Sequence, residues 1–150
     1  MKLIAHRGLT QGPNKDLENN PDQILKAKNQ GYDCEIDLWK INADLWLGHD
    51  APQYPISQKF LDRNYESIWI HAKNLNALYF LTGAAYMYFW HENDAFTLTS
   101  NRYIWTYPDK ELTNQSICVM PEWHDPEFKN LNKICYGICS DYVEKIKNLV

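Results

Sequence analysis

Residues 32–38 read Tyr-Asp-Cys-Glu-Ile-Asp-Leu, a short run of strand-forming residues that carries two acidic side chains near its end. Because side chains alternate between the two faces of a strand, Glu35 and Asp37 lie on the same face. Two carboxylates this close in a partly buried setting repel each other unless a cation, a proton or a basic side chain lies between them. The stretch therefore favours a strand with a site for a divalent metal ion. An exposed Asp37 and a Glu35 paired with a lysine would explain the same residues.

Titratable side chains also end other apolar runs of the chain. Leu3–His6 is followed by Arg7, Leu45–Leu47 by Gly48-His49-Asp50, and Ser67–Ala72 contains His71 and precedes Lys73. A parallel barrel builds its active site at the carboxyl ends of its strands, from several different strands. Singly, each histidine is more often a surface or core residue. Together they predict an active site.

Strand-like runs outnumber helical ones along the sequence. Helices are expected over Gln23–Gln30 behind an Asn20-Pro21 start signal, over Ser57–Asn64 and Asn74–Leu81, and at Tyr142–Leu149. Between residues 90 and 121 the connections are too short for crossover helices. A barrel of usual length spends about 31 residues per βα unit, whereas this chain offers about 19. We therefore expect an α/β fold, namely a reduced TIM-like (β/α) barrel with several outer helices missing, mainly in the C-terminal half.

Composition narrows the class of protein. The chain has 150 residues, of which 45% are hydrophobic and 23% charged, which predicts a single globular domain over residues 1–150. A formal charge of -4 without a basic patch argues against nucleic acid as a partner. Since no apolar run approaches the roughly 20 residues of a membrane span, none is expected. The start of the chain has no apolar segment typical of a signal peptide, so a cytoplasmic protein is expected.

The cysteines and the aromatic residues add two expectations. Cys34, Cys118, Cys135 and Cys139 are expected to be structural thiols, because their spacing, even with His124 added, matches no common zinc site. Aromatic residues make up 14% of the chain, more than a core of this size needs. We expect some of these rings to pack the core and others to line a cleft and stack on a ligand.

Four short motifs follow one another in the first fifty residues: Ala5-His6-Arg7-Gly8, Glu18-Asn19, Cys34-Glu35-Ile36-Asp37 and Gly48-His49-Asp50. In order and spacing they resemble the motifs of the glycerophosphodiester phosphodiesterase family, which is related to the phosphatidylinositol-specific phospholipase C barrels. Residues 136–142 resemble the Gly-Ile-x-Thr-Asp strand that closes the family's barrel. The similarity is dense over residues 3–50, thin in the middle and present again at 136–142.

The resemblance implies roles for particular residues. His6 and His49 would be the general acid/base pair, Glu35 and Asp37 would hold a divalent cation, and Arg7 would lie near the phosphate. Lys73 and Trp39 are expected to contact the substrate together with Arg7. Glu18 is expected either to ligate the cation or to orient Arg7, and a solvated loop carboxylate is the alternative.

The sequence departs from the family at the third metal ligand. Members usually present a Glu two residues before a Lys on the next strand, and here His71 stands two residues before Lys73. Strand alternation puts both on one face, so His71 should lie near Glu35 and Asp37. Among Mg²⁺, Ca²⁺, Mn²⁺ and Zn²⁺, a Glu, Asp and His ligand set favours Mn²⁺ or Zn²⁺, because imidazole suits transition metals. A metal-free site is the alternative.

The resulting prediction is a metal-dependent enzyme that hydrolyses a small, glycerophosphodiester-like phosphodiester. The alternative is a non-catalytic module that binds a phosphate ester or sugar phosphate and has lost hydrolysis. Two features motivate this alternative: the exchange of a carboxylate for His71, and the 21 residues between His49 and His71, which leave no room for the family's substrate-covering insertion.

Overall fold

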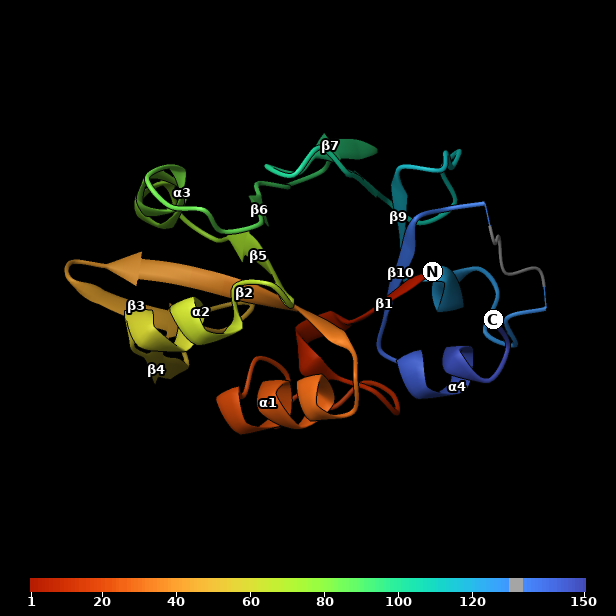
Figure 1. The fold of residues 1–150 in the computed structure, drawn as a ribbon, viewed down its shortest axis with the longest axis horizontal. Coiled ribbons are helices and arrows are strands. Elements are labelled where there is room, and N and C mark those ends of the chain that lie inside the picture. The colour runs from red at the N-terminus through yellow and green to blue at the C-terminus, as the bar shows by residue number, and fades with distance from the viewer. Residues whose placement is uncertain (130–133) are drawn as a thin grey trace.

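The structure, a computed structural model, describes residues 1–129 and 134–150. Within these ranges ten strands form one sheet, and four short α-helices accompany it (Figure 1). The strands are β1 (Lys2–Ala5), β2 (Asp33–Ile41), β3 (Asp44–Leu47), β4 (Tyr54–Ile56), β5 (Ile68–Ala72), β6 (Tyr88–Phe89), β7 (Phe96–Leu98), β8 (Ile104–Thr106), β9 (Ser116–Val119) and β10 (Gly137–Ser140). The helices are α1 (Pro21–Asn29), α2 (Gln58–Asn64), α3 (Leu75–Thr82) and α4 (Val143–Lys147), with 3₁₀ turns η1 (His6–Gly8) and η2 (Pro121–Trp123).

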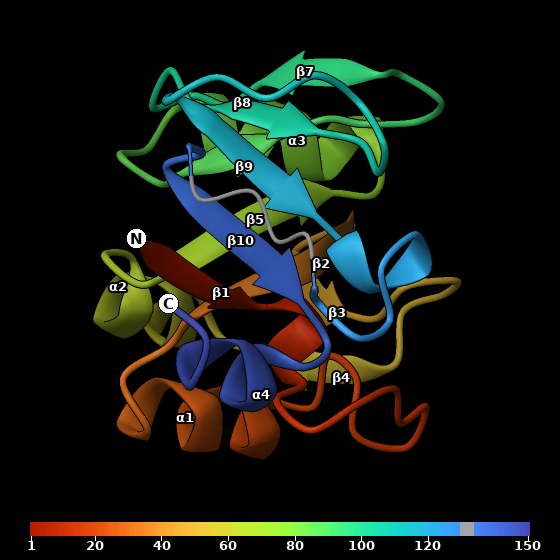
Figure 2. The same cartoon turned by 90° about the vertical axis from the view of Figure 1, so that its right-hand side faces the viewer.

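The sheet is mixed. Seven strands run parallel in the order β6-β5-β2-β1-β10-β9-β8, and Figure 2 shows β1, β10 and β9 side by side. At the carboxyl end of β2 the chain turns back, so that β3 pairs antiparallel with β2, and β4 pairs antiparallel with β3. β7 pairs antiparallel with β8. Among the described residues no strand pairing joins β6 to β7 or β8. The curved sheet is therefore not closed into a ring and forms an open half-barrel.

The expectation of a reduced TIM-like (β/α) barrel is therefore wrong. Helices do not alternate with strands around a closed ring, because only α1, α2 and α3 connect neighbouring parallel strands, and β3 and β4 are inserted before α2. Between α3 and α4 the described residues contain no α-helix, and short loops connect β6, β7, β8 and β9. Connections this short cannot hold a crossover helix, as the sequence indicated. The strands that they connect also do not close the sheet into a ring.

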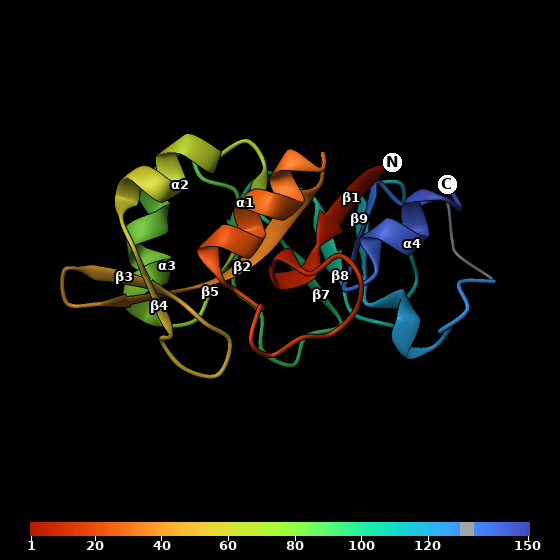
Figure 3. The same ribbon diagram turned by 90° about the horizontal axis from the view of Figure 1, so that it is seen from below.

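The four helices cover the outer face of the curved sheet. Ile24 of α1, Leu61 of α2 and Leu81 of α3 are fully buried in the same cluster as Ile36 and other outward-facing residues of β2 and β5. Seen from below, α1 lies between α2 and α4 (Figure 3). The sequence signals placed these helices well. At the start of α1, for example, the Asn20 side chain accepts hydrogen bonds from the backbone N–H groups of the first turn.

The inner face of the sheet changes character along the strands. A second apolar cluster fills its lower part, and its members include Ile4, Trp69, Phe89, Trp105 and Cys139. Because strand neighbours two positions apart share a face, the next inward residues are the ones that follow toward the carboxyl ends. They are His6, His71, His91, Tyr107 and Asp141. Along these strands the inner face thus changes within two residues from an apolar core to a polar and aromatic end.

In the two described ranges no helix is long and apolar enough to span a membrane.

The cysteines provide a prediction about accessibility. All four are thiols, and burial raises the pKa of Cys34 and of Cys118 to about 12, and that of Cys139 well above its usual value. A thiol with a pKa of about 12 is thiolate in only about one molecule in 10⁴ at pH 8, and the thiolate is the reacting form. We expect these three thiols to stay largely unlabelled by Ellman's reagent in the folded protein and to react after unfolding in guanidinium. Rapid labelling of Cys34 or Cys139 in native protein, located by mass spectrometry, would contradict this burial.

Candidate functional site

A pocket of about 490 Å³ opens at the carboxyl ends of the parallel strands. Most of the residues that the sequence assigned to a site line it: His6, Arg7, Glu35, Asp37, His49, His71 and Lys73. Aromatic side chains also line it, and they meet the charged group where His71 stacks on Phe89: Phe89, Trp90, Trp105, Tyr107 and Trp123. One pocket therefore joins a charged end to an aromatic end.

Asp37 lies at the centre of the charged end and is almost fully buried. Its Oδ1 is 3.0 Å from His71 Nδ1 and 3.6 Å from Lys73 Nζ. Its Oδ2 lies 3.1 Å from His49 Nδ1 and 3.4 Å from Arg7 Nε. Burial alone would raise the pKa of Asp37, but the hydrogen bonds from His49 and His71 and the surrounding positive charge outweigh it, so the pKa lies well below its usual range. Asp37 is therefore ionised and gathers basic side chains around it.

Asn19 fixes the position of the Asp37 carboxylate. Its side-chain amide donates to Asp37 Oδ2 at 2.9 Å, and its Oδ1 accepts from the Asp37 backbone N–H at 2.8 Å. The residue is fully buried and has a left-handed backbone, with φ of 60°, which asparagine tolerates better than most residues. Asn19 thus holds both the side chain and the backbone of Asp37.

Glu35 and Arg7 meet beside this centre. The Arg7 backbone N–H donates to Glu35 Oε2 at 3.1 Å, and the Arg7 guanidinium donates to Glu18 Oε2 at 2.7 Å. Burial and the neighbouring Asp37 raise the pKa of Glu35. Of the two roles expected for Glu18, the geometry matches the orientation of Arg7, because Glu18 belongs neither to the lining of the pocket nor to the acidic cluster.

His6 and His49 are each oriented through Nδ1 by a carboxylate. His6 Nδ1 is 2.8 Å from Asp141 Oδ1, and His49 Nδ1 is 3.1 Å from Asp37 Oδ2. Since a carboxylate only accepts, the proton lies on Nδ1 in both rings, and the Nε2 atoms are left for chemistry. Burial lowers the pKa of His6, but the hydrogen bond to Asp141 and the charge of Glu35 outweigh it, so the pKa is raised.

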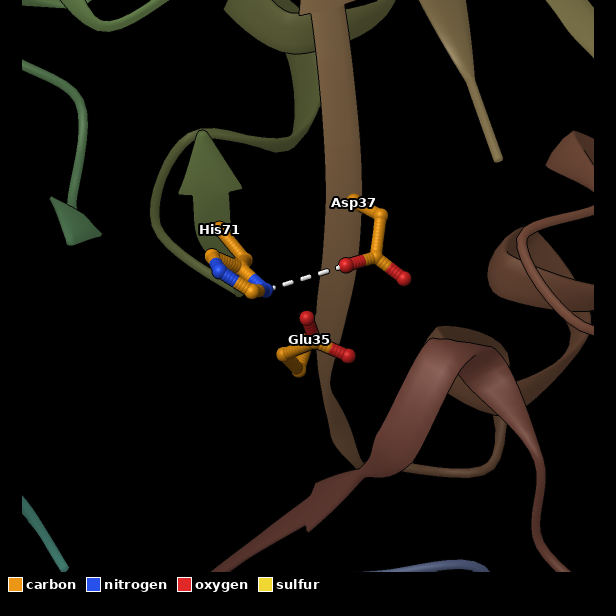
Figure 4. A group of neighbouring side chains, drawn as sticks. All are labelled: Glu35, Asp37 and His71. Atoms are coloured by element: carbon orange, nitrogen blue, oxygen red, sulfur yellow. Dashed lines mark ion pairs between the residues drawn. The ribbon is translucent and has the colours of Figure 1, made fainter. Parts of the chain in front are cut away.

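Glu35, Asp37 and His71 are grouped as a metal site would require. One ligand atom from each lies within 4.8 Å of the others, and Figure 4 shows the three side chains converging from β2 and β5. His71 Nε2 lies 3.0 Å from the His91 carbonyl oxygen, which can only accept, so Nε2 donates there and Nδ1 faces the acids. Nδ1 donates to Asp37 when the ring is doubly protonated and can ligate a metal ion when the ring is neutral. A metal-ligating histidine is usually held in this way, with its other N–H donated to a carbonyl or carboxylate. The donor set therefore fits a divalent ion.

Trp39 does not line the pocket. Its indole N–H donates to the Gly48 carbonyl at 2.7 Å and holds the loop that carries His49. Gly48 has φ of 151°, and a Cβ at this position would collide with the Ala51 carbonyl oxygen, so the loop requires glycine. Trp39 thus lies outside the pocket lining and supports the loop that carries His49, and its predicted contact with a substrate stays a prediction.

Three residues of the site had no role assigned from the sequence. Asp141 and Asn19 occur inside the motifs quoted above, but nothing in a motif says which histidine or carboxylate a residue will contact. His91 lies two residues after β6, whereas His71 lies within β5. Its side chain lines the pocket, and its carbonyl orients His71. A titratable residue directly after a strand was the signal that could have identified His91.

Comparison with known proteins adds no assignment: no protein-family model, no curated protein and no solved structure matches the chain.

Proposed function

We propose that the protein hydrolyses a small phosphodiester, with a divalent metal ion held by Glu35, Asp37 and His71. One observation carries the proposal: two histidines with carboxylate-oriented rings share a pocket with an arginine and a group of metal-ligand side chains. This set supplies both proton transfer and charge stabilisation, which phosphodiester cleavage needs. The resemblance to the glycerophosphodiester phosphodiesterases supports the same reaction.

In the proposed reaction, water and a phosphodiester give a phosphomonoester and an alcohol. One of His6 and His49 accepts a proton from the attacking hydroxyl at Nε2, a P–O bond forms, and the bond to the leaving oxygen breaks. The other histidine, which enters the reaction doubly protonated, donates its Nε2 proton to that oxygen and keeps its Nδ1 proton on the carboxylate. Arg7, fixed by Glu18, and Lys73 bind the non-bridging oxygens. A metal ion at Glu35, Asp37 and His71 would add Lewis-acid polarisation of the phosphoryl group.

The direct test is turnover of bis(p-nitrophenyl) phosphate with Mg²⁺, Ca²⁺, Mn²⁺ or Zn²⁺. We expect release of p-nitrophenol that depends on the metal and is lost in His6→Ala. His124→Ala is the matched control, because His124 is exposed and does not line the pocket. Absence of turnover with every metal, or full activity in His6→Ala, would contradict the proposal.

Metal choice provides a prediction at His71. A neutral imidazole adds no negative charge to the two carboxylates, so affinity for Mg²⁺ and Ca²⁺ should be lower than affinity for Mn²⁺ or Zn²⁺. We expect His71→Glu to shift the preference toward Mg²⁺ or Ca²⁺ by about tenfold or more. Calorimetric titration of both proteins measures this, with His124→Glu as the control for added charge. Equal Mn²⁺ and Mg²⁺ affinities in wild type and in His71→Glu would refute the assignment of His71 as a ligand.

A second candidate is a non-catalytic module that binds phosphate esters. The observation that favours it is the cluster of basic groups around Asp37, which supplies an anion site even without a metal ion. It predicts calorimetric binding of glycerol 3-phosphate without any product from the corresponding diester. Lack of binding to phosphate esters would reject it.

We also propose a cytoplasmic location. The four cysteines are thiols, and a reducing compartment keeps thiols in that form.

A further inference from the structure

We infer that one ester arm of the substrate carries a flat ring, such as a nucleobase or another planar heterocycle, which stacks on one of the two side chains Tyr107 and Trp123 and lies edge-on to the other. This inference rests on the proposed function and names the substrate class of the same pocket. The phosphate would lie at the charged end, and the ring would lie at the aromatic end.

The aromatic end is continuous with the metal-ligand group. The ring centroids of His71 and His91 are 6.1 Å apart, those of His91 and Tyr107 are 5.6 Å apart, and those of Tyr107 and Trp123 are 6.3 Å apart. These three ring contacts therefore connect His71, a proposed metal ligand, with Trp123, an exposed residue of the pocket. When the phosphate is bound at the charged end, each ester arm of the substrate extends either along these rings or away from them.

Tyr107 and Trp123 are exposed, unlike the aromatic residues behind them. Trp123 is 58% exposed and Tyr107 is 41% exposed, whereas Phe89 and Trp105, stacked with their centroids 4.4 Å apart, are nearly fully buried. Two neighbouring aromatic side chains exposed beside a polar pocket form the kind of apolar surface on which a ligand can stack. The buried pair belongs to the core, and the exposed pair is the ligand surface.

The segments that carry the exposed pair are anchored to the rest of the fold. Trp123 ends η2, and the Glu122 carboxylate of η2 accepts from the Ser140 hydroxyl at 2.8 Å and from the Asp141 backbone N–H at 2.9 Å. The Tyr107 backbone N–H donates to the Ala95 carbonyl at 2.9 Å. Preorganised rings lose little conformational entropy when they bind, which favours stacking as their role.

The angle between the rings favours a flat ligand over a cationic one. The Tyr107 and Trp123 planes meet at 78°, which leaves one ring face for stacking and one ring at its side. A quaternary ammonium group is instead surrounded by several aromatic faces.

The experiment compares four methyl phosphodiesters that differ in one arm: adenosine 5′-yl, ethyl, cyclohexyl and choline. Their binding to His49→Ala is measured by calorimetry with Mn²⁺, so that binding is read without turnover. We expect the adenosine ester to bind about 5- to 100-fold more tightly than the ethyl ester. That preference should largely disappear in Trp123→Ala and in Tyr107→Ala, both on the His49→Ala background, and persist in Trp123→Phe. Tyr79→Ala is the matched control, because Tyr79 is exposed on α3 and does not line the pocket.

Each result decides between alternatives. Equal affinity for the adenosine and ethyl esters would overturn the ring site and leave the proposed hydrolysis standing, since turnover is measured separately. A cyclohexyl ester that binds as tightly as the adenosine ester would overturn planar stacking, and a choline ester that binds most tightly would replace it with cation binding. If none of the four esters binds, both the ring site and the proposed phosphodiester pocket are overturned.

Discussion

Replacing His49 with alanine is expected to lower kcat for phosphodiester hydrolysis by about 10²- to 10⁴-fold, the usual contribution of a positioned general acid or base. Its ring is oriented by Asp37 through Nδ1, with the side chain about one third exposed in the pocket. His49 belongs to none of the apolar clusters of the described residues, so the melting temperature should change little. The measurement is steady-state kinetics with bis(p-nitrophenyl) phosphate, alongside thermal unfolding of the same samples.

His124→Ala serves again as the control and should keep wild-type rates. A His49→Ala protein that hydrolyses the diester within threefold of wild type would remove His49 from the mechanism. A fall in rate that is accompanied by loss of the folded state would instead make His49 a structural residue.

Asp37→Asn is expected to destabilise the protein by about 3–5 kcal/mol, as happens when one partner of a buried ion pair is removed. The change keeps the size of the side chain but leaves Arg7 and Lys73 without the carboxylate that they face. It also exchanges a charged metal ligand for a neutral one, so Mn²⁺ binding should weaken strongly. Urea denaturation measures the first effect, and calorimetry measures the second.

The matched control is Asp44→Asn at the exposed start of β3, which removes the same charge from the surface. Surface substitutions of this kind usually change the free energy of unfolding by less than about 0.5 kcal/mol. If Asp37→Asn is no less stable than Asp44→Asn, the basic groups around Asp37 do not depend on it for compensation.

Local signals predicted the elements of this fold better than their arrangement. The strand over Tyr32–Leu38 and the helix after Asn20 are present close to the predicted residues. The hairpin between β2 and β3 was not predicted. It turns at Asn42, whose left-handed backbone, with φ of 53°, is a turn conformation that asparagine tolerates. Reading the strands of the first half as parallel βα units made a reduced barrel the natural expectation. Pairing partners depend on long-range contacts that periodicity does not contain.

The candidate site was predictable to a similar degree. Strand alternation correctly brought Glu35 and Asp37 together and placed His71 beside them, since β2 and β5 are neighbours with Asp37 opposite His71 in the register. Trp39 lies on the same face of β2 as Glu35 and Asp37, but β2 extends past the pocket at this position. The Trp39 indole donates to the Gly48 carbonyl instead. The role of Asp141 depends on the pairing of β1 with β10, which no local pattern reports.

That pairing has a consequence for how the protein is made. Among the described strands, β1 leaves the ribosome first and its partner β10 leaves last, and the contact between His6 and Asp141 spans 135 positions of the chain. At a synthesis rate of about 5–20 residues per second, one edge of β1 waits roughly 7 to 27 s for its neighbour. During this interval the hairpin of β2, β3 and β4 has time to form, whereas His6 has no Asp141 to orient it. Nascent chains should therefore gain secondary structure well before they gain activity, and the waiting edge of β1 is where a chaperone or a second nascent chain would compete with β10.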